Sequence, residues 1–225
     1  MEPMAAISRK MKLTDIQTTI APAGLDIYGA FHPDADDMSE AKTLVMLGPS
    51  ADFWNIFTKS PEYTDKTRNP IDRWSTRVLT DLANTVSAHA IFPFGGPPYA
   101  PFIAWAKQSG RAWASPVGML IHDTTGLMVS YRGALAFDEI LDLPTKAPKK
   151  PCDTCETKPC VVACPVDALG PNGYNVQACH AYLDTDAGAE CMTMGCIARR
   201  SCPISVGANR QDAQSALHMR AFRGR

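Results

Sequence analysis

Cysteine is absent from the first 151 residues of this 225-residue chain, and all eight cysteines follow between positions 152 and 202. A charge surplus is also absent, because the formal net charge is −1. That balance gives no electrostatic reason to expect nucleic acid or an anionic membrane as a partner. The chain is long enough, and at 45% hydrophobic residues apolar enough, to bury a core without cross-links. The cysteines therefore need a reason other than folding.

Several segments with recognisable roles are missing as well. The first twenty residues contain no apolar signal segment, and no apolar run is long enough to span a bilayer. We therefore expect a cytoplasmic protein with no membrane partner. The chain contains no Walker loop, no G-x-G-x-x-G and no G-x-S-x-G, so it shows no nucleotide fingerprint and no hydrolase nucleophile. In a reducing cytoplasm, clustered cysteines more often bind metal or do redox work than form disulfides.

The residues before the cysteines alternate between strand-like and helix-like patterns. Those patterns predict strands at 24–33, 42–50 and 90–94, helices at 69–88 and 99–110, and a hairpin formed by 117–123 and 126–137. This order predicts an α+β domain over residues 1–145. Residues 146–151 are rich in Lys and Pro and are typical of a linker. Residues 152–225 form a cysteine-rich module and a tail that we expect to hold a helix, with a solvated basic end.

The cysteine spacing is the most specific signal in the chain. Residues 152–165 read C-x2-C-x4-C-x3-C-P, which is two residues longer than the bacterial ferredoxin run C-x2-C-x2-C-x3-C-P. In ferredoxins with two clusters, the fourth cysteine of that run ligates the other cluster. The same crosswise assignment predicts two [4Fe–4S] clusters here. One would be held by Cys152, Cys155, Cys160 and Cys202, and the other by Cys164, Cys179, Cys191 and Cys196.

Three alternatives stay open at this point. Zinc competes because C-x2-C is also a zinc knuckle, although zinc sites usually show two such pairs or a pair with histidines. Disulfides compete only if the protein is exported. A single cluster is the third alternative, because the second run, C-x4-C-x5-C-P, is looser than standard motifs.

The module resembles a known family. The run CDTCETKPCVVACPVDAL, the segment ACHAYLDT and the final cysteines ending in C-P resemble the ferredoxin-type module of epoxyqueuosine reductases and related reductive dehalogenases. Cys179 matches an isolated cysteine of that family, with Tyr182 and Leu183 alongside. The resemblance implies two [4Fe–4S] clusters with crosswise ligands. It also implies that a nitroreductase-like α/β sandwich, which holds cobalamin in the family, precedes a small ferredoxin-like dicluster module.

The cobalamin pocket is where the chain departs from the family pattern. The corresponding stretch, GRAWASPVGM at 110–119, keeps only Trp113 and Gly118 of the family's pocket segment. Tyr131 and Arg132, in SYRGALAF, are further candidates to face a bound ligand or the module, although Arg132 could instead pair with a carboxylate at the domain junction. The family's tRNA-binding helical-repeat domain has no counterpart in this sequence, so we expect no nucleic acid partner.

Three functions follow from these patterns, in order of preference. The first is an electron-transfer protein that exchanges single electrons between its clusters and a redox partner protein. The second is an oxidoreductase in which the clusters feed cobalamin or another cofactor in the N-terminal domain. The third is a sensor of oxygen or iron with a labile cluster. The substrate of an enzyme, if the chain is one, is not readable from the sequence.

Overall fold

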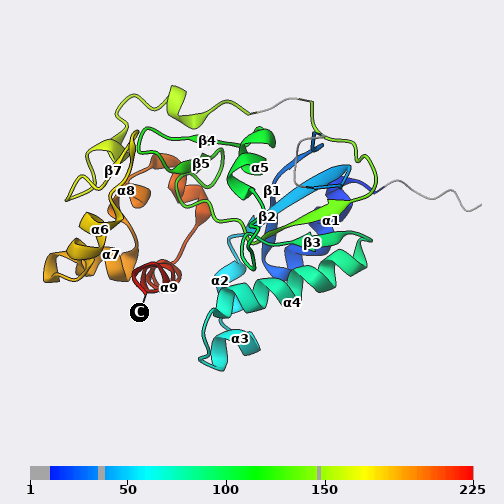
Figure 1. Ribbon diagram of the computed structural model, residues 1–225, viewed down its shortest axis with the longest axis horizontal. Helices are drawn as coiled ribbons and strands as arrows, with labels where there is room; N and C mark the ends of the chain where they lie inside the picture. The colour runs from blue at the N-terminus through cyan, green and yellow to red at the C-terminus, as the bar shows by residue number, and fades with distance from the viewer. Residues whose placement is uncertain (1–10, 35–38, 146–147, 225) are drawn as a thin grey trace, which may run out of the picture.

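The computed structural model describes residues 11–34, 39–145 and 148–224 (Figure 1). Within those ranges the chain is a mixed α+β structure with a four-stranded sheet and two small two-stranded sheets. The α+β prediction is therefore confirmed at this level. The start of the expected N-terminal domain, the first two residues of the expected linker and the last residue of the tail lie outside the described residues.

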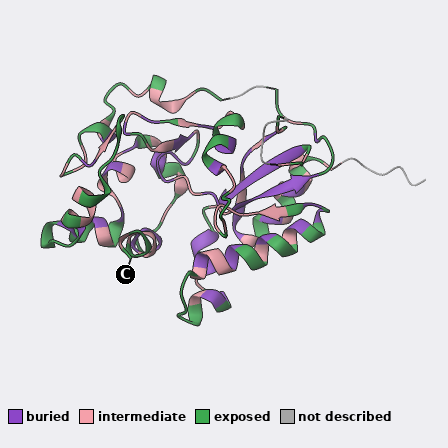
Figure 2. Ribbon diagram, viewed as in Figure 1, coloured by how far each residue is buried: buried purple, intermediate pink, exposed green. Residues whose placement is uncertain are grey.

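The central sheet is antiparallel, with the strand order β1-β2-β6-β3. Its strands are β1 (Leu25–Phe31), β2 (Thr43–Pro49), β3 (His89–Ile91) and β6 (Gly133–Phe137). β2 and β6 are buried at every position, and Figure 2 shows them in purple. A strand that is covered on both faces needs a continuous apolar sequence, which TLVMLGP and GALAF supply. The strands predicted at 24–33, 42–50 and 90–94 are confirmed, with shorter bounds.

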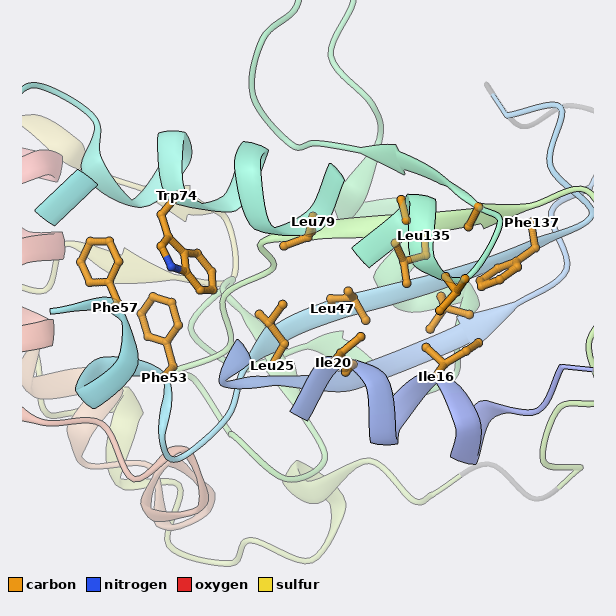
Figure 3. Packing of buried hydrophobic residues seen from close by; sticks show 14 of the residues in the cluster. Ile16, Ile20, Leu25, Leu47, Phe53, Phe57, Trp74, Leu79, Leu135 and Phe137 are labelled. Atoms are coloured by element: carbon orange, nitrogen blue, oxygen red, sulfur yellow. The ribbon is translucent and has the colours of Figure 1, made fainter. Parts of the chain in front are cut away.

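Helices cover both faces of this sheet. They are α1 (Leu13–Ile20), α2 (Phe53–Phe57), α3 (Pro61–Thr64), α4 (Pro70–Thr85) and α5 (Phe102–Gln108), with a 3₁₀ turn, η1 (Ala21–Ala23), after α1. On one face Leu47 and Leu135 pack among side chains of α1, α2 and α4 (Figure 3). On the other face Met46 and Ala134 pack against α5. Neighbouring residues of a strand thus point into two different apolar cores, one on each face of the sheet. The N-terminal part is therefore a three-layer sandwich of helices, sheet and helix.

The two predicted helices are confirmed. α4 begins with Pro70 at its first position, and Trp74 and Leu79 lie on its buried face, as the amphipathic pattern of 69–88 predicts. α5 is shorter than the predicted 99–110 and is followed by Gly110 in a left-handed conformation. Both helices are therefore set by local sequence, and the sheet decides which face each one buries.

The hairpin predicted from 117–123 and 126–137 is wrong. β5 (Leu120–His122) pairs instead with β4 (Ala112–Ala114), and Ala112 lies opposite His122. The Asp-Thr-Thr-Gly turn makes only a single bridge, between His122 and Gly126. β6 lies between β2 and β3 in the central sheet, because its fully apolar sequence needs cover on both faces.

The C-terminal part consists of short elements. They are η2 (Pro151–Asp153), η3 (Pro159–Val161), β7 (Leu169–Gly170), β8 (Gly173–Tyr174), α6 (Val176–Leu183), η4 (Asp186–Gly188), α7 (Ala189–Met194), α8 (Ile197–Arg200), η5 (Pro203–Ala208) and α9 (Asp212–Arg223). The helix expected in the tail is α9. The expectation that this end is simply solvated is wrong, because α9 packs against α7 and buries Gln214, Ser215 and Ala216.

The N-terminal and cysteine-rich parts are in direct contact. Gly126, at φ +58°, lies so close to the second part that an added Cβ would be 2.5 Å from the backbone nitrogen of Ser205. The backbone N–H of Leu127 donates to Ser205 Oγ at 3.1 Å, and Arg199 Nη1 donates to the Leu127 carbonyl at 2.7 Å. The domain division at 146–151 stays a prediction, but the two parts share buried contacts.

In the ranges that the structure describes, no helix combines the length and the apolar character needed to cross a bilayer.

Candidate metal centre

The eight cysteines line two separate cavities. The first cysteine group surrounds a cavity of about 350 Å³ and consists of Cys152, Cys155, Cys160 and Cys202. The second cysteine group surrounds a cavity of about 280 Å³ and consists of Cys164, Cys179, Cys191 and Cys196. The two groups contain the same cysteines as the two ligand sets that the sequence predicted. Whether clusters fill the cavities stays a prediction.

The first cysteine group is held by three short helical turns, each with a proline at its start. Pro151 opens η2 at Cys152, Pro159 opens η3 at Cys160, and Pro203 opens η5 directly after Cys202. Proline suits a first helical position because it fixes φ and needs no acceptor for an N–H. Lys158, directly before η3, adopts a left-handed conformation at φ 41°.

The surroundings of the first group are apolar. Cys160 and Cys202 are buried in one cluster with side chains of the N-terminal part, namely Val117, Ile121 and Leu127. Thr154, Glu156 and Lys158 line the outer side of the cavity and are exposed. A cluster at this place would be shielded on one side by hydrocarbon and be open to solvent on the other.

The second cysteine group is distributed over more elements. Cys164 precedes Pro165, Cys179 lies in α6, Cys191 lies in α7, and Cys196 precedes α8. Two hydrogen bonds reach its sulfur atoms. The backbone N–H of Ala168 donates to Cys164 Sγ at 3.2 Å, and the Tyr174 hydroxyl donates to Cys179 Sγ at 3.2 Å. Donors of this kind stabilise negative charge on sulfur and tune a bound metal.

The pKa is raised at four of the cysteine thiols, two in each group. Burial raises the pKa of the Cys152 and Cys160 thiols, and the neighbouring Cys202 raises both further. Burial likewise raises the pKa of Cys191 and Cys179, with Cys196 adding to the effect, while the Tyr174 hydrogen bond opposes it at Cys179. Adjacent thiolates repel one another, so a positively charged centre is needed to deprotonate each set.

A single metal ion is a different requirement from a cluster. Among the residues described, no group of three or more His, Cys, Asp or Glu side chains converges closely enough to hold one ion. Zinc draws four ligands to about 2.3 Å from one point, whereas each thiolate around a cubane binds its own iron. The finding therefore concerns a site for a single ion and not the more widely spaced thiolates that a cubane requires.

Two half-buried arginines and a histidine distinguish the second cavity. Arg199, Arg210 and His218 line it together with the cysteines. Arg199 and Arg210 donate to the main-chain carbonyls of Leu127 and Met128, each at 2.7 Å. Neither arginine forms an ion pair within the described part of the chain. The second cavity therefore carries positive charge that four thiolates and a cluster could balance.

The surroundings of these three side chains shift their pKa values. Burial and the nearby Arg199 together lower the pKa of Arg210 to about 10, while Tyr28 opposes the shift. Burial and the arginines also hold the pKa of His218 well below its usual value, so its imidazole is neutral near pH 7. Sequence reasoning missed these three residues because no motif marks them. The local signal was the Arg-Arg pair that begins three residues after Cys196 in GCIARRSCP.

The four residues proposed to bind a cofactor do not meet in one cavity. Trp113, on β4, packs against the apolar cluster of the first cysteine group. Gly118, at φ +75°, marks a close approach, because an added Cβ would lie 2.7 Å from the carbonyl oxygen of Gly170. Tyr131 is buried beside Tyr28, with ring centroids 5.8 Å apart. Arg132 lines a third cavity.

Two of these four residues carry a buried polar atom that has no hydrogen-bond partner among the described residues. These atoms are the Tyr131 hydroxyl and Arg132 Nε. Burial raises the pKa of Tyr131, so its hydroxyl keeps its proton. Such orphaned groups usually cost about 1–3 kcal/mol and call for an explanation. Arg132 Nη2 does have a partner, since it donates to Ser130 Oγ at 2.7 Å.

Known proteins offer no guide to this site. No protein-family model matches the chain, and neither a curated protein nor a solved structure matches it. The resemblance to epoxyqueuosine reductases therefore stays an expectation that depends on the quoted motifs. A functional conclusion has to rest on the two cysteine-lined cavities.

Proposed function

We propose that this protein is an iron–sulfur electron-transfer protein that holds two [4Fe–4S] clusters. The supporting observation is that eight cysteines divide into two sets of four, each set around its own cavity. Cys152, Cys155, Cys160 and Cys202 would hold one cluster, and Cys164, Cys179, Cys191 and Cys196 the other. When bound, such clusters accept and donate single electrons.

The chain connects the two cavities closely. Cys160 lines one cavity and Cys164 lines the other, and these residues are only four positions apart. Four residues span at most roughly 14 Å even when fully extended. A short segment would therefore hold the two proposed clusters next to each other, which would suit transfer between them and onward to a redox partner protein.

The finer fold belongs to the same proposal. Helices on both faces of an antiparallel sheet support a nitroreductase-like sandwich for the N-terminal part. Short turns around eight cysteines support a ferredoxin-like dicluster module for the C-terminal part. In this arrangement the module has little apolar core of its own, and metal binding would contribute to its folding.

A reductase is the second candidate, and one observation favours it. Arg132 lines a cavity of about 770 Å³ between the N-terminal part and α9, which is large enough for a small-molecule ligand. Cobalamin itself is not supported, because Trp113, Gly118, Tyr131 and Arg132 do not face one common space. We therefore derive no step through cobalamin.

The test is the iron and acid-labile sulfide content of protein purified without oxygen, with an absorption spectrum of the same sample. Two cubanes predict about eight irons and eight sulfides per chain. Corrinoid or flavin bands in the same spectrum would favour the reductase. About four irons would leave one cavity without a cluster, and zinc in place of iron would contradict the proposal.

A further inference from the structure

The third cavity lies between the start of α4 and α9. Figure 1 shows α9 facing the end of α4 that α3 precedes. We call it the α4–α9 cavity and define it by the charged and titratable side chains that line it: Lys66, Arg68, Asp72, Arg132, His218 and Arg220. Its volume of about 770 Å³ lies within the range of small-molecule sites.

The charge of this cavity is strongly one-sided. Lys66, Arg68, Arg132 and Arg220 are cationic, whereas Asp72 is the single acid in its lining. Asp72 attracts Arg132 electrostatically, but the two form no ion pair within the described ranges. A cavity with four cations and one carboxylate attracts anions.

Arg132 is the fixed element of the cavity. Its backbone N–H donates to the Leu47 carbonyl at 2.8 Å, which ties it to the central sheet next to β6. Its Nη2 atom is satisfied by Ser130, but its buried Nε atom has no partner among the described residues. Arg132 lines the cavity, and its guanidinium carries further N–H donors besides the one that Ser130 accepts from, so it is suited to an oxyanion, because planar arginine forks bind phosphates and carboxylates.

The beginning of α4 adds an independent contribution. α4 is 16 residues long, and its N-cap, Asn69, makes no side-chain capping hydrogen bond. Asn69 and Pro70 both line the cavity. The first N–H groups of a long helix are left without helical acceptors, and the helix dipole makes this end positive. The same end of the helix is a common place for bound anions.

We propose that the α4–α9 cavity binds a small molecule through an oxyanion group, a phosphate or a carboxylate, held between Arg132 and the start of α4. His218 lines both this cavity and the cavity of the second cysteine group. The bound molecule would therefore lie beside the second group, separated from it by a neutral imidazole. The site itself does not depend on the presence of iron.

The test is calorimetric titration of the full chain, purified without oxygen, with pyrophosphate and separately with malonate at constant ionic strength. We expect at least one of the two probes to bind, and Arg132→Met to weaken it by about tenfold or more. Binding of pyrophosphate alone identifies a phosphate ligand, and binding of malonate alone identifies a carboxylate ligand. Binding of both supports the shared oxyanion chemistry.

Two variants at exposed positions keep the proposal testable if Arg132→Met does not fold. Arg68→Gln and Arg220→Gln change exposed cations of the cavity, and each is expected to weaken binding severalfold. Lys107→Gln is the matched control, because Lys107 is an exposed cation on α5 outside the cavity lining. The proposal is overturned if neither probe binds, or if the cavity variants bind as tightly as Lys107→Gln.

Discussion

The two cysteine groups have the same number of thiols but very different surroundings. The first group is set against hydrocarbon from the N-terminal part, with Cys160 and Cys202 buried in an apolar cluster. The second group faces Arg199, Arg210 and His218 and receives hydrogen bonds at two of its sulfur atoms. Identical ligands can therefore produce two centres of different potential, because charge and hydrogen bonding around the sulfur atoms set that potential.

The direction of the difference follows from electrostatics. Reduction adds negative charge to a cluster, so nearby cations and N–H or O–H donors favour the reduced state. These groups surround the second cavity, whereas apolar side chains and burial at the first disfavour added charge. We therefore expect the second centre to have the higher reduction potential and to be the end point of transfer within the protein.

The largest effect expected is the loss of one centre. Cys202→Ser and Cys196→Ser should each lower the iron content from about eight to about four per chain. Cys202→Ser should also lower the free energy of unfolding by about 2 kcal/mol more than Cys196→Ser, because a buried hydroxyl without a partner costs about 1–3 kcal/mol. Cys196 is only half-buried. Urea unfolding with iron analysis checks both points, and equal losses of stability would remove the contrast between the groups.

A smaller effect is expected from one half-buried cation. Arg199→Met should make the potential of the second centre more negative by roughly 90 mV, which corresponds to about 2 kcal/mol for a charge several ångströms away. The first centre should not change. Arg200→Met is the comparison variant: Arg200 also acts electrostatically on Cys191, but it pairs with Glu190 and does not line the cavity, so its removal should shift the potential less.

A redox titration followed by electron paramagnetic resonance distinguishes the two arginine variants. Equal shifts in Arg199→Met and Arg200→Met would show that net charge, and not the lining of the second cavity, sets the potential. A shift of the first centre alone would reverse the proposed order of the two groups.

The smallest effect concerns a single hydrogen bond. Tyr174→Phe removes the hydroxyl that donates to Cys179 Sγ and should lower the potential of the second centre by roughly 20 mV, or about 0.5 kcal/mol. Tyr99→Phe is the control, since Tyr99 is 62% exposed and lies outside the lining of that cavity. The same titration measures both variants, and an unchanged potential in Tyr174→Phe would mean that this donor does not act on the cluster.

Local patterns predicted some elements well and others not at all. α4 was predictable because Pro70, Trp74 and Leu79 carry its start and its buried face within one stretch of sequence. The pairing of β6 was not predictable, because the turn residues at 123–126 are typical of a hairpin. The strand before this turn, β5, pairs with β4, and β6 pairs with β2. Its true neighbours, β2 and β3, are distant in the sequence and are chosen by the need to cover an apolar strand on both faces.

The candidate site divides in the same way. The cysteine spacing alone was enough to propose two sets of four, since a proline after the fourth cysteine of a ferredoxin run marks the ligand of another cluster. The arginines of the second cavity carry no such signal. Arg199 lies between Cys196 and Cys202 in the sequence, but Arg210 and His218 come from the end of the chain, between η5 and the end of α9.

The sequence by itself determined the chemistry that this protein can offer: eight thiols at ferredoxin-like spacing and an apolar N-terminal part able to form its own core. Ligand spacing is local, so a short stretch of chain can encode it. Only the tertiary structure decided what surrounds each cysteine group, because burial and charge depend on residues brought together from distant positions. Arg132, on the strand side of the α4–α9 cavity, shows this most clearly. Its place beside the start of α4 arises from sheet pairing and helix packing, which no local pattern specifies.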